Sequence, residues 1–244
     1  MSESKPRVAL FVTCIVDLVR PDIGFDTVKV LEAAGYEVEV PAAQTCCGQP
    51  NYNGGDKQGA LAVARRNIDM LSAYERVVIP SGSCAGMIKC DYPRMLGDDP
   101  VYGPKANALA EKVWELASFL VDVAGYHPSP AALGKLTYHD GCAGLRELGI
   151  KSQPRQLLTE AGGELVEAPM AETCCGFGGT FCIKYPEISN NMVQRKVDDV
   201  LATGAPRLVT GDLGCLLNME GKLHRDGHEL PVCHFVELLA GGVE

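Results

Sequence analysis

The sequence predicts an α/β fold made of two duplicated halves, each with its own parallel sheet, related by a pseudo-twofold axis. Three observations lead to this prediction: the chain repeats itself, short β-branched runs alternate with helical stretches in both copies, and cysteines follow those runs. The chain has 244 residues, of which 46% are apolar and 22% charged. This length and composition are typical of a globular protein with a substantial core.

The repeat is anchored by cysteines. Four positions of the first half recur in the second half, each 128 positions later. They are Cys14, Cys46, Cys47 and Gly48, which recur as Cys142, Cys174, Cys175 and Gly176. Cys84 recurs as Cys215 at a spacing of 131, so the second copy has gained three residues. Because Pro128 and Pro130 break any helix, we predict one repeat over residues 1–127 and the other over residues 128–244.

The elements follow from the hydrophobic pattern. Short β-branched runs bounded by turn residues predict strands at residues 8–12, 37–40, 77–80, 136–138, 165–167 and 208–210. Amphipathic stretches between them predict helices at about residues 26–34, 55–74, 154–161 and 186–202. Strands that alternate with helices predict Rossmann-like βαβ units and a parallel sheet in each half.

Every recurring cysteine comes shortly after a predicted strand. In a parallel sheet all carboxyl ends of the strands lie at one edge, and open α/β folds bind their ligands there. The sequence therefore predicts two groups of converging thiols. They are Cys14, Cys46, Cys47 and Cys84 in the first half, and Cys142, Cys174, Cys175 and Cys215 in the second half.

Four converging thiolates are typical ligands of an iron–sulfur cluster and also of structural zinc. Zinc sites usually use two cysteines separated by two residues, a spacing that occurs nowhere in this sequence. Adjacent cysteines can bind different irons of one larger cluster, and Gly48 and Gly176 give the backbone freedom for that turn. We therefore predict up to one cluster in each half, of the [4Fe–4S] type, with the eight recurring cysteines as ligands. The glycine-rich residues 176–179 either donate N–H groups to cluster sulfides or form only a loop.

Other uses of cysteine fit the pattern less well. A vicinal disulfide closes a strained ring, and a nucleophilic cysteine needs a histidine partner. His139 lies near Cys142 in sequence but has no histidine counterpart in the first half, so we interpret it as structural. We interpret Cys90, Cys182 and Cys233, which do not recur, as incidental thiols. No catalytic residue is assigned, and no G-x-G-x-x-G follows a strand, so hydride chemistry is expected on a partner.

Charge and hydropathy limit the partners and the cellular compartment that we expect for this protein. Lys and Arg number 22 against 31 Asp and Glu, which gives a net charge of −9 without a basic run. This balance counts against nucleic acid or anionic lipid as a partner. The apolar run at residues 8–12 is too short for a signal peptide, and no stretch has the length of a transmembrane segment. We therefore expect a cytoplasmic protein, and in that reducing compartment eleven cysteines point to metal or redox chemistry and not to disulfides.

The doubled cysteine pattern resembles the CCG-domain family of (Fe–S)-binding oxidoreductases. The segments that carry the resemblance are residues 11–14, 46–50, 81–84, 173–181 and 215–218. The family includes the B subunit of heterodisulfide reductase and the iron–sulfur subunit of glycolate oxidase. The small two-repeat members known as lactate utilization proteins A are more similar.

This resemblance implies an iron–sulfur electron-transfer subunit, without flavin, of a complex that oxidises L-lactate to pyruvate. The implied partners are a ferredoxin-like iron–sulfur protein and a third small subunit. Two alternatives stay open: a thiol/disulfide redox subunit like that of heterodisulfide reductase, and a zinc-binding scaffold without redox activity. Heterodisulfide-reductase-like members end each repeat in Cys-x-x-Cys and place five sulfurs around a noncubane cluster. Met87 and Asn218 stand at the last position here, which favours a four-ligand cubane cluster.

Overall fold

The computed structural model describes residues 5–242, which form two four-stranded parallel sheets. The strand order is β2-β1-β3-β4 in the first sheet and β6-β5-β7-β8 in the second. In each sheet the first strand of the half, β1 or β5, lies between the next two strands of the chain, so the direction of the strand order changes there. Ligands of open α/β sheets bind at such a switch point, and the first cysteine of each group follows this strand. The predicted α/β class with duplicated halves is confirmed.

The strands are short, and six of the eight lie at or next to predicted positions. Their bounds are β1 (Arg7–Leu10), β2 (Glu37–Glu39), β3 (Val77–Ile79), β4 (Val113–Glu115), β5 (Gly134–His139), β6 (Gly163–Leu165), β7 (Leu208–Thr210) and β8 (Val232–His234). The prediction for residues 165–167 was two residues too late. Strands β4 and β8 were not predicted, because they end in the buried polar residues Glu115 and His234 and lack a β-branched run.

The helices cover the sheets and connect their strands. In the first half they are α1 (Cys14–Val19), α2 (Asp22–Ala33), α3 (Gln49–Gly54), α4 (Lys57–Leu71), α5 (Gly82–Gly86), α6 (Tyr92–Leu96), α7 (Tyr102–Ala110) and α8 (Leu116–Ser118), with π-helical turns η1 (Met87–Asp91) and η2 (Phe119–Val123). In the second half they are α9 (Cys142–Leu148), α10 (Ser152–Glu160), α11 (Phe181–Lys184), α12 (Pro186–Ala202), α13 (Leu213–Arg225) and α14 (Phe235–Ala240). The four predicted helices correspond to α2, α4, α10 and α12. Among the described residues no helix is both long and apolar enough to span a membrane.

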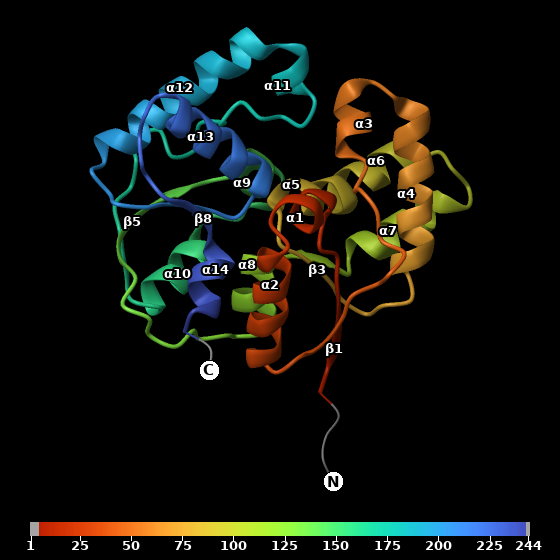
Figure 1. The fold of residues 1–244 in the computed structure, drawn as a ribbon. Coiled ribbons are helices and arrows are strands. Elements are labelled where there is room, and N and C mark those ends of the chain that lie inside the picture. The colour runs from red at the N-terminus through yellow and green to blue at the C-terminus, as the bar shows by residue number, and fades with distance from the viewer. Residues whose placement is uncertain (1–4, 243–244) are drawn as a thin grey trace.

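The two halves share part of their core. Helix α14, from the end of the second half, packs on α2 of the first half, and α8 and η2 of the first half pack on α10 of the second (Figure 1). One continuous apolar cluster contains Val8 and Leu10 from the first sheet together with Leu136 and Leu208 from the second. The first sheet thus ends at residue 115 and the second begins at residue 134, but this apolar cluster extends over both sheets. The predicted limits of the two repeats, at residues 127 and 128, stay a prediction.

The halves also meet where the cysteine-bearing helices cross. Helix α5, which carries Cys84, contacts α9, which begins at Cys142, and α13, which carries Cys215, contacts α1, which begins at Cys14. A Cβ atom on Gly82 would lie 2.9 Å from the Cα atom of Gly144. Only a glycine therefore lets these helices approach so closely.

Replacing Gly82 by Ala is expected to destabilise the protein by about 1–3 kcal/mol, because the added methyl forces α5 and α9 apart. Gly221→Ala in α13 is the control, since a Cβ there meets nothing within 4 Å. That substitution should raise stability by up to about 1 kcal/mol through helix propensity. Urea unfolding of the metal-free, reduced proteins measures both; equal stability of the two variants would contradict the close crossing.

Candidate metal centres

A cavity of about 210 Å³ in the first half is lined by all four cysteines that the sequence predicted to converge there. Cys14 begins α1 after β1, Cys46 and Cys47 lie in the loop between β2 and α3, and Cys84 lies in α5 after β3. The parallel topology places these segments at the carboxyl edge of the sheet. Cys47 is buried, with 2% of its surface exposed, and the other three are half-buried.

The second half repeats this arrangement. A cavity of about 270 Å³ is lined by the other four predicted cysteines, Cys142, Cys174, Cys175 and Cys215. The Sγ atoms of Cys142 and Cys174 are 3.9 Å apart. Cys175 and Cys215 are buried, with exposed fractions of 1% and 7%. All eleven cysteines of the chain are free thiols, so both groups are chemically available as ligands.

The turn at each vicinal pair depends on the following glycine. Gly48 and Gly176 have φ values of 88° and 86°, a left-handed conformation that glycine adopts without strain. In this turn the glycine N–H donates to the sulfur two residues earlier. The N···Sγ distance is 3.4 Å for Gly48 to Cys46 and also for Gly176 to Cys174. The two halves thus use one backbone device to hold the pair.

Side chains then fix the peptide carbonyls of each pair, and here the halves differ. In the first half the Tyr92 hydroxyl donates to the Cys47 carbonyl at 2.7 Å, and Asn67 donates to the Cys46 carbonyl at 3.0 Å. In the second half Asn218 donates to the Cys175 carbonyl at 2.9 Å. Asn218 thus holds the loop that bears the second vicinal pair.

Within each group, the ionisation of one thiol changes the pKa values of its neighbours. Hydrogen bonds from the thiols of Cys14 and Cys47, and from the Gly48 N–H, lower the pKa of Cys46 to about 2. The pKa of Cys14 and of Cys47 is raised, because both donate to Cys46 and are partly or fully buried. One negative charge therefore makes the next deprotonation costly.

The second group behaves in the same way. Hydrogen bonds from Cys142 and Cys175 lower the pKa of Cys174 to about 2, and the pKa values of both donors are raised. A nearby cation would overcome this repulsion, so that all four thiols of a group could ionise together. Such a donor set fits a metal ion or an iron–sulfur cluster.

The two cavities lie side by side and share part of their lining. The shared residues are Gln49, Ser83, Phe177, Gly179 and Asp212. The Asp212 carboxylate, 6% exposed, accepts hydrogen bonds from the Ser83 N–H at 2.9 Å and the Ser81 hydroxyl at 3.2 Å. By the spacing of 131, Ser81 is the counterpart of Asp212, so the two residues meet across the pseudo-twofold axis. Sequence reasoning missed Asp212, although the repeat already pairs it with Ser81.

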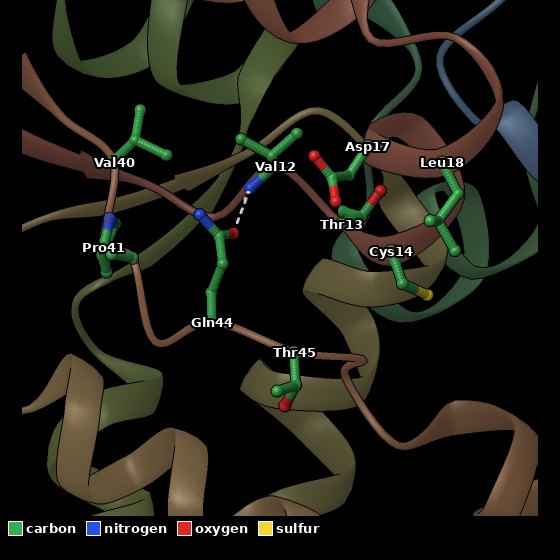
Figure 2. Close-up of a pocket in the computed structure, with 10 residues that line it drawn as sticks. Val12, Thr13, Cys14, Asp17, Leu18, Val40, Pro41, Gln44 and Thr45 are labelled. Carbon is green, nitrogen blue, oxygen red and sulfur yellow. Dashed lines mark hydrogen bonds between the residues drawn. The ribbon is translucent and has the colours of Figure 1, made fainter.

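A third cavity, of about 330 Å³, opens on the outer side of Cys14. Figure 2 shows its lining, with the Val12 N–H donating to the Gln44 side-chain oxygen at 2.7 Å. Thr13, which also lines this cavity, has a φ of 77°, a strained value for a residue with a side chain. Because Cys14 lines both this cavity and that of the four thiols, it is approachable from two sides.

The three cysteines that do not recur are not part of the lining of either four-cysteine cavity. Cys90 is in η1, Cys182 is in α11 and Cys233 is in β8. Burial raises the pKa of Cys233 to about 12, so it behaves as an inert thiol. Their interpretation as incidental thiols stays a prediction, and it supplies controls for substitution experiments.

A buried carboxyl, that of Glu115, lines a small cavity together with Asp212. Glu115 ends β4 and accepts a hydrogen bond from the Ser118 N–H at 3.1 Å. Burial raises its pKa from 4.5 to about 7. Below about pH 4.5 both folded and unfolded states are protonated and this contribution to stability is complete. As the pH rises to about 7 the unfolded state loses the proton first, so the contribution is lost.

Glu115→Gln, which mimics the protonated carboxyl, is expected to remove this loss. The parent should lose up to about 3 kcal/mol of stability between pH 4.5 and pH 7 from this group, and the variant should not. Glu75→Gln is the control, because that side chain is 89% exposed. Urea unfolding at several pH values measures the difference. Parallel pH profiles for the parent and Glu115→Gln proteins would contradict it.

The fold and the cavities define a class: a duplicated α/β protein in which each parallel sheet presents four clustered cysteines as a candidate metal or iron–sulfur site. The cysteine-rich CCG domain model matches residues 8–89 and again residues 136–220. The chain therefore belongs to the CCG cysteine-rich domain family, and each match begins in or next to the first strand of a sheet.

Curated relatives match the whole chain. It is 47% identical over 235 residues to lactate utilization protein A of Oceanobacillus iheyensis, covering 96% of both chains. It is 45% identical over 244 residues to the protein of that name from Exiguobacterium sp., covering 98% of this chain and 99% of the relative. A hypothetical protein from Helicobacter pylori has the same fold, with a TM-score of 0.71 at 11% identity over 97% of this chain. This chain spans 49% of that protein.

Proposed function

We propose that this chain is an iron–sulfur electron-transfer subunit of a cytoplasmic system that oxidises L-lactate to pyruvate. The observation that carries the proposal is the gathering of four free thiols in each of two adjacent cavities. The lactate assignment is supported by full-length relatives that are named lactate utilization protein A.

Each repeat would hold its cluster with its own four cysteines. The ligands would be Cys14, Cys46, Cys47 and Cys84 in the repeat at residues 1–127, and Cys142, Cys174, Cys175 and Cys215 in the repeat at residues 128–244. A [4Fe–4S] cluster, when bound, supplies one-electron transfer. The glycine N–H groups at Gly48 and Gly176 already donate to a sulfur of each group. Such donors stabilise negative charge on the site.

The shared lining couples the two repeats. Phe177, Gly179 and Asp212 line both cavities, so an electron that passes from one half to the other would cross this shared lining. Cys14, approachable also from the outer cavity, offers an edge of the first site to a partner. The partners we propose are a ferredoxin-like iron–sulfur protein and a third small subunit of the same system.

A host strain that lacks this chain tests the proposal. It should fail to grow on L-lactate as the sole carbon source but grow on pyruvate, and the parent gene should restore growth. Genes carrying Cys47→Ser or Cys175→Ser should not restore it, whereas Cys90→Ser should. Normal growth of the deletion strain on lactate would refute the lactate assignment, and rescue by both ligand variants would refute the role of the thiols.

A further inference from the structure

The second site contains a histidine that the first site lacks. His139 ends the central strand β5, and 1% of its surface is exposed. One of its ring nitrogens forms a compact group with the Sγ atoms of Cys175 and Cys215, with these atoms all within 4.8 Å of one another. His139 thus lies on the buried side of the vicinal pair, next to two of the four thiols of the second half.

Neither ring nitrogen of His139 has a hydrogen-bond partner among residues 5–242. A buried imidazole without partners costs free energy, because it has lost its hydrogen bonds to water and gained none in the protein. Lys196, also buried nearby, does not relieve this cost, since its ammonium donates to the carbonyls of Met170 and Ala171. The ring nitrogen beside the two sulfurs therefore needs a partner of another kind.

The repeat shows that this histidine is specific to one half. The residue 128 positions before His139 is Phe11, which is fully buried in the apolar core beside the first site. An apolar aromatic side chain is thus sufficient to fill this position in the core. A histidine at the equivalent position adds a nitrogen lone pair, which is a common ligand of iron and zinc.

We infer that a ring nitrogen of His139 is a fifth protein ligand of the metal centre in the second half, on an iron that it shares with the thiolate of Cys175 or Cys215, so that this centre is a mixed cysteine–histidine site while the first is all-cysteine. This inference rests on the proposed function in that it requires a metal centre there. Histidine ligation raises the reduction potential of an iron–sulfur centre relative to thiolate ligation alone. The second centre is therefore the electron-accepting member of the pair, and electrons pass from the first half to the second.

The test uses the full chain with Cys47→Ser, which leaves only the second centre, and with ¹⁵N-labelled histidine. After anaerobic reconstitution and reduction with dithionite, pulsed EPR should show a nitrogen coupling of the strength of a coordinated imidazole. His139→Phe, which copies the residue of the other half, should abolish this coupling and lower the reduction potential. His224→Gln, an exposed histidine in α13, should leave both unchanged.

Mössbauer spectra of the oxidised, ⁵⁷Fe-labelled proteins give a second readout. A distinct iron subsite should be present in the Cys47→Ser protein and absent when His139 is also replaced by Phe. Iron without a coordinated-nitrogen coupling and without that subsite would overturn the role of His139 alone. If the Cys47→Ser protein takes up no iron at all, the proposed function falls together with this inference.

Discussion

Replacing Cys175 by Ser is expected to remove the iron of the second half and to leave that of the first, so that the chain retains about half of the parent's iron. A hydroxyl is a harder and far less acidic ligand than a thiol, and Cys175 lies at the buried end of its group. The fold should survive, because the sheets and helices bury apolar surface independently of the cavity. Iron per chain after anaerobic reconstitution measures the effect, with near-ultraviolet circular dichroism as the check on folding.

The repeat supplies matched variants for this experiment. Cys47→Ser should remove the iron of the first half by the same reasoning. Cys90→Ser and Cys233→Ser should leave the iron content unchanged, because these cysteines line neither four-cysteine cavity. Equal iron in the Cys175→Ser and parent proteins would contradict the ligand set of the second half. A loss of iron in the Cys90→Ser protein would show that a thiol outside the repeat takes part.

Gly176→Ala should lose more stability than Gly82→Ala, Gly204→Ala or Gly221→Ala. The φ of Gly176 is +86°, and an added Cβ would lie 2.9 Å from the Ser189 carbonyl oxygen and 2.9 Å from the Cβ of Met192. The left-handed conformation costs an L-residue about 1–2 kcal/mol, and overpacking adds about 1–3 kcal/mol. The turn must shift to relieve this strain and will carry Cys174 and Cys175 with it.

Gly204→Ala separates the two contributions. Gly204 also has a positive φ, +64°, but a Cβ there meets nothing within 4 Å. The Gly204→Ala protein should lose only about 1–2 kcal/mol of stability and keep the parent's iron content. Urea unfolding of the reduced, metal-free proteins and iron analysis of the reconstituted ones measure both effects. If Gly176→Ala were no less stable than Gly204→Ala and bound as much iron, the turn would not be needed to place the pair.

The convergence of the cysteines could be predicted because it depends on two features visible in sequence. The repeat pairs each cysteine of one half with one of the other, and the alternation of strands and helices predicts parallel sheets whose carboxyl ends meet. Both cavities contain the predicted thiols for that reason. The strand β3, which is a continuous buried apolar run, was also placed to within a few residues.

What the sequence did not predict depends on contacts between distant residues. Strands β4 and β8 are three residues long and end in Glu115 and His234, so no hydrophobic run marks them. The packing of α14 on α2 follows only from the arrangement of both halves around a shared core. The closeness of His139 to Cys175 and Cys215 could not be predicted either, because the three residues lie in separate segments of the chain.

The content of iron and inorganic sulfide in the anaerobically purified chain shows whether the eight thiols hold iron–sulfur clusters. We expect iron and sulfide in similar amounts, with a brown colour that dithionite bleaches and air destroys. Zinc in place of iron, or iron without inorganic sulfide, would contradict this expectation and would favour a metal-binding scaffold without electron transfer.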